Sequence, residues 1–138
     1  MNRWIIDIET NLSHDTIWCI VARNTEHPDI VKVWTLDGLF GHPDLDNFNY
    51  WFSYTLPCVV GHNVCAFDIP VMNRVLGMTI NSEFPKAIDT FVVSRLTAYK
   101  HHKGHGLDEL GTKLGYPKIE FNDFSQLTEE MIEYCIMD

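Results

Sequence analysis

The chain has 138 residues, of which 46% are hydrophobic and 21% are charged, which predicts one folded domain with its own core rather than a disordered chain. Its net charge of −9 argues against a broad electrostatic grip on nucleic acid, but it leaves open a nucleic-acid enzyme whose acidic site is neutralised by metal. The sequence has no apolar run long enough to span a bilayer and no signal-peptide layout, so we expect a soluble, cytoplasmic protein with no membrane partner.

Three strands are predicted at the start of the chain, at residues 3–8, 16–22 and 30–35, where β-branched and aromatic residues are frequent. The segment from Asn24 to Asp29 is expected to form the turn between the second and the third strand. Connections this short favour an antiparallel meander of three strands.

Helices and short strands are predicted to alternate after the meander. Apolar residues at helical spacing predict a helix from Leu45 to Leu56, with Asp44 in its first turn. Strands are expected at 58–60 and 86–88, and a further helix is expected at 66–76.

The last third of the chain is predicted to be helical. Asp89 is expected to cap a helix that runs through Tyr99, although residues 91–93 could instead extend the preceding strand. Another helix is predicted at 107–114, and Thr128 is expected to cap the last one. This order of elements predicts an α/β fold with helices packed on a central mixed sheet.

The four cysteines are spread along the chain with no C-x-x-C pair between them: Cys19, Cys58, Cys65 and Cys135. Such spacing predicts small buried residues in a reducing compartment rather than a disulfide framework or a zinc site.

Two carboxylates stand on the first predicted strand. Asp7 and Glu9 share one face of it, whereas Ile6 and Ile8 point to the other face, because side chains alternate along a strand. Adjacent carboxylates on so apolar a strand are unfavourable without compensation. Asp7 and Glu9 therefore mark either an exposed strand end or a cation site.

Further acidic positions occur at the ends of predicted helices. Asp68 stands at the head of a helix, where the helix dipole favours an ionised carboxylate, and its alternative role is an ordinary N-cap. Tyr134 and Asp138 lie one helical turn apart and share a face. The alternatives for this pair are a core aromatic and a disordered chain end.

Together these positions resemble the three motifs of the DEDD (DnaQ-like) 3′→5′ exonucleases. The three motifs are Asp7-x-Glu9, His62-Asn63-x₄-Asp68 and Tyr134-x₃-Asp138. Glu133 stands where the DEDDh branch has a histidine, and Tyr134 indicates the DEDDy branch, that of polymerase proofreading domains. Residues 88–96 and 104–111 look like the exonuclease domain of T7-like phage family A DNA polymerases, which implies the host cytoplasm if the protein is viral.

The resemblance implies one exonuclease domain over residues 1–138, with a ribonuclease H-like fold built on a mixed five-stranded sheet. It implies that two divalent cations, Mg²⁺ or Mn²⁺, are held by Asp7, Glu9, Asp68 and Asp138. Hard cations of this kind prefer carboxylate oxygens, and two of them can activate the attacking water and stabilise the leaving 3′-oxygen. Tyr134 would position that water or help to deprotonate it. The implied product is a nucleoside 5′-monophosphate.

Substrate contacts are implied by the same motifs. Thr10 and Leu12 follow the first motif and would grip and wedge the terminal nucleotide, while His62, Asn63 and Phe67 occupy the second motif along the strand path. Apolar and aromatic side chains can stack on bases without reading their sequence. Core packing is the alternative for Leu12 and Phe67.

The one basic cluster is Lys100-His101-His102-Lys103-Gly104-His105. A solvated loop is the first interpretation, and a weak phosphate contact is the second. The spacing of its histidines matches no zinc pattern.

Three functions remain open at the level of the sequence. The favoured one is a 3′→5′ exonuclease acting on a 3′ end, with single-stranded DNA as the preferred substrate. The others are an RNA exonuclease and a non-catalytic module that binds nucleic acid or a separate polymerase subunit. A stand-alone enzyme, a fragment and one half of a split polymerase are equally compatible with the sequence. Asp138 is its last residue, where the α-carboxylate would add negative charge.

Overall fold

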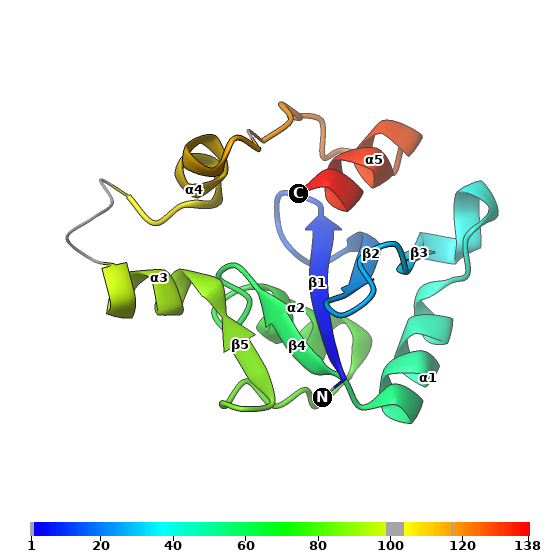
Figure 1. Cartoon of the computed structure of the whole chain (residues 1–138). Helices are drawn as coiled ribbons and strands as arrows, with labels where there is room; N and C mark the ends of the chain where they lie inside the picture. The colour runs from blue at the N-terminus through cyan, green and yellow to red at the C-terminus, as the bar shows by residue number, and fades with distance from the viewer. Residues whose placement is uncertain (1, 99–103, 117) are drawn as a thin grey trace.

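The computed structural model of this chain describes residues 2–98, 104–116 and 118–138. Five strands form one sheet in the order β3-β2-β1-β4-β5 (Figure 1). Their bounds are Arg3–Thr10 (β1), Ile17–Asn24 (β2), Val31–Thr35 (β3), Cys58–Gly61 (β4) and Ala87–Asp89 (β5). The pairs β1–β2 and β2–β3 are antiparallel, whereas β4 is parallel to both β1 and β5. The predicted meander and the mixed five-stranded sheet are therefore confirmed.

Within the described residues, five α-helices and one 3₁₀ segment accompany the sheet. Their bounds are Leu36–Gly41 (η1, 3₁₀), Leu45–Thr55 (α1), Asp68–Leu76 (α2), Thr90–Ala98 (α3), Leu107–Leu114 (α4) and Glu129–Met137 (α5). Thr128 caps α5 as predicted, because its hydroxyl accepts a hydrogen bond of 3.1 Å from the backbone N–H of Met131. Asp44 is the N-cap of α1 rather than part of its first turn, and its carboxylate accepts from Asn47 N at 2.9 Å.

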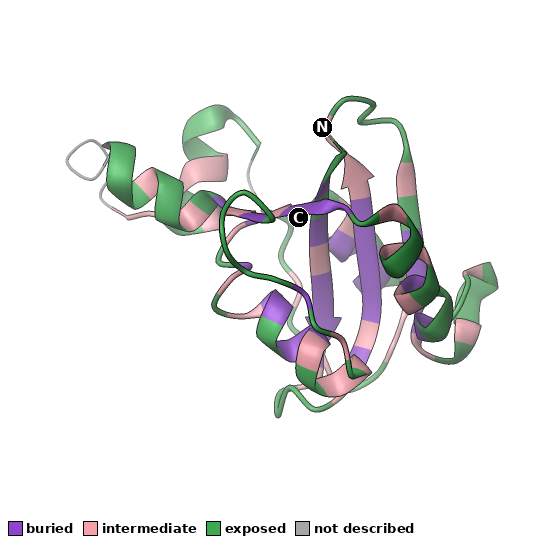
Figure 2. Cartoon of the chain, turned by 90° about the horizontal axis from the view of Figure 1, so that it is seen from below, coloured by how far each residue is buried: buried purple, intermediate pink, exposed green. Residues whose placement is uncertain are grey.

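The sheet has an apolar core on each face. On one face, Ile6 and Ile8 pack with Phe48 of α1 and Met72 of α2. On the other face, α5 lies over β1 and β2, and its Met131 packs with apolar residues of β2 and with Val33 of β3. Figure 2 shows buried residues running along the central strands, while α3 is mainly exposed. The central strands are thus enclosed between helices on two sides, which makes their polar side chains conspicuous.

Several element ends differ from the predicted ones. β1 continues to Thr10, and the helix predicted at 66–76 begins at Asp68, because residues 63–67 form turns. The alternative in which residues 91–93 extend a strand is wrong, since they lie in α3. The predicted end of that helix at residue 99 lies outside the described residues.

The four cysteines are all free, and three of them are buried, as expected for small core residues. Among the helices in the described ranges, none is long and apolar enough to cross a bilayer.

Candidate active site

β1 supplies two carboxylates to the face of the sheet that α5 covers. Asp7 pairs with Val21 and Glu9 pairs with Cys19 on β2, and both of these partners belong to the core beneath α5. The predicted separation of Asp7 and Glu9 from the isoleucines beside them is therefore confirmed. The register of β1 and β2 shifts directly after Glu9, and such irregularities redirect side chains at the end of a strand.

The connection from β4 to α2 brings a third carboxylate to β1. Asp68 is the first residue of α2 and is 6% exposed. Phe67 is the N-cap, so the interpretation of Asp68 as an ordinary N-cap is wrong. Gly61 allows the close approach needed here, because a Cβ at that position would lie 2.8 Å from the Cβ of Val64.

Asp89, at the end of β5, fixes this connection. Its carboxylate accepts hydrogen bonds from the backbone N–H groups of Asn63 at 2.8 Å, Cys65 at 3.1 Å and Phe91 at 3.0 Å. One buried side chain therefore holds the β4–α2 connection and the start of α3 together.

α5 supplies the remaining two predicted groups. Tyr134 is buried and stacks on Phe121 with ring centroids 5.3 Å apart. The backbone N–H of Asp138 donates to Tyr134 O at 3.0 Å, and the Asp138 side chain is only 9% exposed. The alternative of a disordered chain end is therefore wrong, and the predicted pair lies together at the end of α5, next to the end of β1 (Figure 1).

A pocket of about 470 Å³ collects these groups. The sequence-predicted residues that line it are Asp7, Glu9, His62, Phe67, Asp68, Tyr134 and Asp138. They come from β1, from the β4–α2 connection and from α5, so residues from three distant parts of the sequence meet at one place.

Crowding of buried carboxylates raises their pKa values. Burial, followed by the charge of Asp138, raises the pKa of Asp7 to about 7. Burial and the neighbouring Asp7 raise the pKa of Glu9 to about 8, and burial with the charges of Asp7 and Glu9 raises the pKa of Asp68 well above its usual range. The pocket therefore favours protons or other cations over a full set of bare carboxylates.

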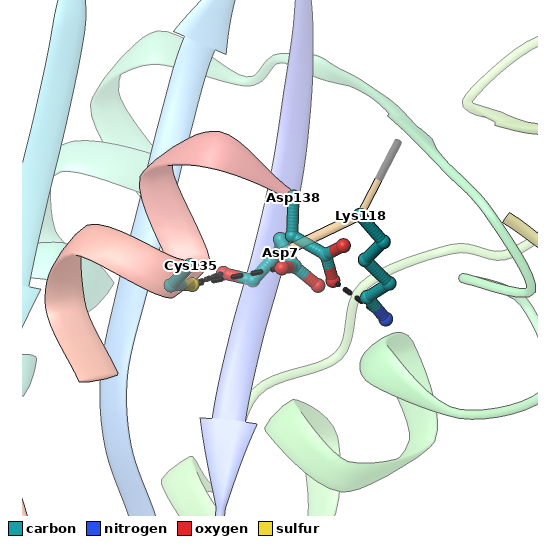
Figure 3. A network of polar contacts seen from close by, with 4 residues as sticks. All are labelled: Asp7, Lys118, Cys135 and Asp138. Carbon is teal, nitrogen blue, oxygen red and sulfur yellow. Dashed lines mark hydrogen bonds and ion pairs between the residues drawn. The ribbon is translucent and has the colours of Figure 1, made fainter. Parts of the chain in front are cut away.

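Lys118 is a member of this site that sequence reasoning missed. Its Nζ lies 3.2 Å from Asp138 Oδ2 (Figure 3). Lys118 also hydrogen-bonds to the side chain of Tyr134. Burial lowers the pKa of Lys118, but these interactions outweigh burial and raise the pKa. One signal was present in the sequence: Lys118 is the only basic residue after Lys113 in a strongly acidic stretch.

The pocket residues fit divalent cations. Glu9 is 8% exposed, and no described residue donates a hydrogen bond to its carboxylate. Its carboxylate lines the pocket, and carboxylate oxygens are the ligands that Mg²⁺ and Mn²⁺ prefer. Asp7, Glu9, Asp68 and Asp138 could hold such ions.

Two of the predicted substrate residues line the pocket and have a polar atom or a ring surface available for a substrate. His62 Nδ1 lies 3.0 Å from Thr90 Oγ1, but its Nε2 is buried and has no hydrogen-bond partner within the part of the chain that the structure describes. Phe67 packs edge-to-face on His14, with centroids 4.9 Å apart, and is only partly buried.

Three other predicted substrate residues do not line the pocket. Thr10 is buried and its hydroxyl donates to Asn11 O at 2.9 Å. Asn63 is exposed, with a positive φ of 60°. Leu12 is 82% exposed in the turn after β1, so core packing is the wrong interpretation for it.

The predicted basic cluster contributes little to the described structure. Its residues 100–103 lie outside the described residues, and His105 Nδ1 lies 2.7 Å from Ser94 Oγ of α3.

Comparison with known proteins gives structural relatives only. No protein-family model and no curated protein sequence matches this chain. NrnC from Brucella melitensis with bound Mg²⁺ is similar with a TM-score of 0.66 and 21% identity, over 100% of this chain and 66% of that chain. The family B DNA polymerase of the hyperthermophilic archaeon Pyrobaculum calidifontis is similar with a TM-score of 0.54 and 14% identity, over 83% of this chain and 18% of that chain. Phi29 DNA polymerase with primer-template DNA and incoming nucleotide substrates is similar with a TM-score of 0.51 and 12% identity, over 99% of this chain and 29% of that chain.

These similarities show the fold. The chain has a ribonuclease H-like α/β architecture, as the sequence motifs predicted. It spans about two thirds of the NrnC chain and less than a third of either polymerase. The finer likeness to the DEDDy branch and to T7-like phage polymerases stays a prediction.

Proposed function

We propose that this chain is a divalent-metal-dependent 3′→5′ exonuclease that releases nucleoside 5′-monophosphates from the 3′ end of single-stranded DNA. One observation carries the proposal: four carboxylates and one tyrosine from three separate parts of the sequence face a single pocket. The shared fold supports it, and so does the Mg²⁺ bound by NrnC.

In this proposal, Asp7, Glu9, Asp68 and Asp138 hold two divalent cations, either Mg²⁺ or Mn²⁺. When bound, these ions would activate the attacking water and neutralise the charge that develops on the leaving 3′-oxygen. The raised pKa values of Asp7 and Glu9 indicate that cations would take the place of protons in this pocket.

Tyr134 is proposed to orient the attacking water. Burial raises the pKa of its phenol, so the group stays protonated near neutral pH and serves as a hydrogen-bonding group rather than as a strong base. The Nζ of Lys118 hydrogen-bonds to the phenol of Tyr134 and pairs with Asp138, and these two interactions restrict the direction of the Tyr134 hydroxyl. Lys118 is thus a positioning residue in the proposed reaction.

The terminal nucleotide is proposed to lie between the pocket and the turn after β1. The unpartnered Nε2 of His62 can contact a phosphate or a sugar hydroxyl, and Phe67 and the exposed Leu12 offer surface for stacking. Thr10 and Asn63 would act from outside the pocket, by shaping the turn and the strand path.

Nucleic acid is the proposed partner, and a separate polymerase subunit is a second one. Two of the structural relatives are DNA polymerases, one of them bound to primer-template DNA, which favours DNA as the substrate. The net charge of −9 implies that binding depends on the metal-loaded pocket more than on a basic surface.

A gel assay with 5′-labelled single-stranded DNA and RNA tests the proposal. With Mg²⁺ or Mn²⁺, we expect a ladder that shortens from the 3′ end, and we expect no ladder with EDTA. Asp7→Ala should abolish the ladder, because it removes a central carboxylate of the pocket. Asp46→Ala is the matched control, since Asp46 is an exposed carboxylate on α1.

A ladder that persists in EDTA or in Asp7→Ala would refute the metal-dependent site. Faster shortening of RNA than of DNA would show that RNA, rather than DNA, is the preferred substrate. Retention of DNA without any cleavage would identify a binding module.

A further inference from the structure

A cysteine thiol lies beside the proposed metal ligands. Cys135 of α5 is 2% exposed, and its Sγ lies 3.6 Å from Asp7 Oδ2 and 3.7 Å from Asp7 O. Figure 3 shows the thiol reaching Asp7 from the side opposite Lys118. Sulfur is not a preferred donor for Mg²⁺ or Mn²⁺, so the role of this thiol is not explained by the proposed function.

The donor atoms of Asp7, Glu9 and Cys135 are close enough to share one ion. One ligand atom from each of the three residues lies within 4.8 Å of the other two. Zinc-like ions hold sulfur at about 2.3 Å and carboxylate oxygen at about 2.0–2.2 Å, which separates the two donors by about 3.5 Å in a tetrahedral site. The 3.6 Å between Cys135 Sγ and Asp7 Oδ2 agrees with that separation.

A second observation points to cation binding at the same place. Glu9 is 8% exposed and lines the pocket, and its carboxylate accepts no hydrogen bond from the described residues. A carboxylate that opens into the pocket without a hydrogen-bond donor, next to a buried thiol, offers the mixed oxygen and sulfur donors that a borderline divalent cation accepts.

We propose that Cys135 is a sulfur ligand, and that Asp7, Glu9 and Cys135 form a site for borderline transition-metal ions such as Zn²⁺, Co²⁺ or Cd²⁺. Binding breaks the S–H bond, releases the proton to solvent and forms a sulfur–metal bond, with no change of oxidation state. The inference rests on the same acidic pocket as the proposed function. It adds that borderline ions compete with Mg²⁺ there and bind more tightly.

Optical titration of the full chain with Co²⁺, in the presence of a non-thiol reductant, tests the sulfur ligand. Wild-type protein should develop a sulfur-to-cobalt charge-transfer band in the near ultraviolet at one equivalent. Cys135→Ser should lose that band and bind Cd²⁺ about tenfold or more weakly, because a hydroxyl is a harder and poorer donor for this ion. Circular dichroism would verify that the variant is folded.

Two other cysteines serve as controls. Cys65→Ser removes the most accessible thiol, and we expect it to keep the band. Cys19→Ser changes the buried thiol that neighbours Cys135, and we expect it to keep the band as well. A band that disappears in Cys19→Ser but persists in Cys135→Ser would overturn the assignment.

The two proposals fail separately. Absence of a charge-transfer band in a wild-type protein that degrades DNA with Mg²⁺ would refute the sulfur ligand and leave the exonuclease. A band that depends on Cys135, in a protein that degrades no nucleic acid, would support the sulfur site and refute the exonuclease.

Discussion

The role of Tyr134 can be distinguished from that of the metal ligands by removing only its hydroxyl group. We expect Tyr134→Phe to lower kcat about 10²-fold, because the variant loses the hydroxyl that is proposed to orient the attacking water. The rise in melting temperature on adding Mg²⁺ should persist, since the phenol is not among the proposed ligands. Single-turnover kinetics and thermal denaturation with and without Mg²⁺ measure both effects.

Tyr50→Phe is the matched control, because Tyr50 is 66% exposed on α1. An unchanged kcat in Tyr134→Phe would remove the tyrosine from the mechanism. Loss of the Mg²⁺ effect would instead show that Tyr134 supports the cation site.

Individual residues were predictable from the sequence where a motif placed them. The spacing of Asp7 and Glu9 fixed their common face, because alternation along a strand is a local property. Lys118 was missed because its partners, Tyr134 and Asp138, become neighbours only when α5 folds back onto the sheet. Cys135 was correctly predicted to be buried, but its contact with Asp7 depends on the same packing.

At the scale of elements, the β4–α2 connection depends on one side chain. Asp89→Ala removes the acceptor of three backbone N–H groups, so we expect the free energy of unfolding to fall by about 2–4 kcal/mol. Exonuclease activity should fall with it, because this connection carries His62 and Asp68. Urea denaturation followed by circular dichroism measures the loss of stability.

Asp44→Ala is a control of the same chemistry, because Asp44 caps α1 through one backbone N–H. Its removal should cost about 1 kcal/mol and leave activity intact. Equal losses in the two variants would contradict the organising role of Asp89.

Element types followed from the sequence, whereas some element ends did not. Apolar spacing and the cap at Thr128 are local signals, and they located α1 and α5 correctly. The start of α2 was misplaced because the turns after Asn63 are stabilised by Asp89, a residue on another strand. Contacts between distant segments thus decide the ends that sequence periodicity cannot.

At the scale of the whole molecule, stability should depend on pH and metal in opposite ways. The folded chain raises the pKa of Asp7 from 3.8 to about 7 and that of Glu9 from 4.5 to about 8. At pH values between the unfolded and the folded pKa of each residue, the folded state binds more protons than the unfolded state. The stability of the folded state therefore falls as pH rises through this interval. In EDTA, we therefore expect the melting temperature to fall between about pH 5 and pH 8.

Mg²⁺ or Mn²⁺ should oppose this fall, because the cations bind the deprotonated carboxylates of the folded state. The rise in melting temperature on adding metal should be larger at pH 8 than at pH 5. The double variant Asp7→Asn, Glu9→Gln should lose most of both effects. A melting temperature in EDTA that is flat or rises over this range would contradict the proposed proton uptake.

The architecture as a whole was predictable because three motifs and their order define a known fold. A mixed five-stranded sheet follows from a meander joined to β4 and β5 by helical connections. The position of α5 over β1 and β2 did not follow from periodicity, because an apolar helical face does not specify which surface it covers.

The two faces of the sheet also differ in their aromatic content. Trp4 and Trp34 each lie close to Trp51, with ring centroids 5.1 and 4.9 Å apart, in the core on the side of α1. Trp18 is the one tryptophan that packs on the side of α5, where its indole N–H donates to Phe124 O at 2.9 Å. The fluorescence of Trp18 is thus a built-in, label-free reporter of whether α5, with Tyr134 and Asp138, is docked on the sheet.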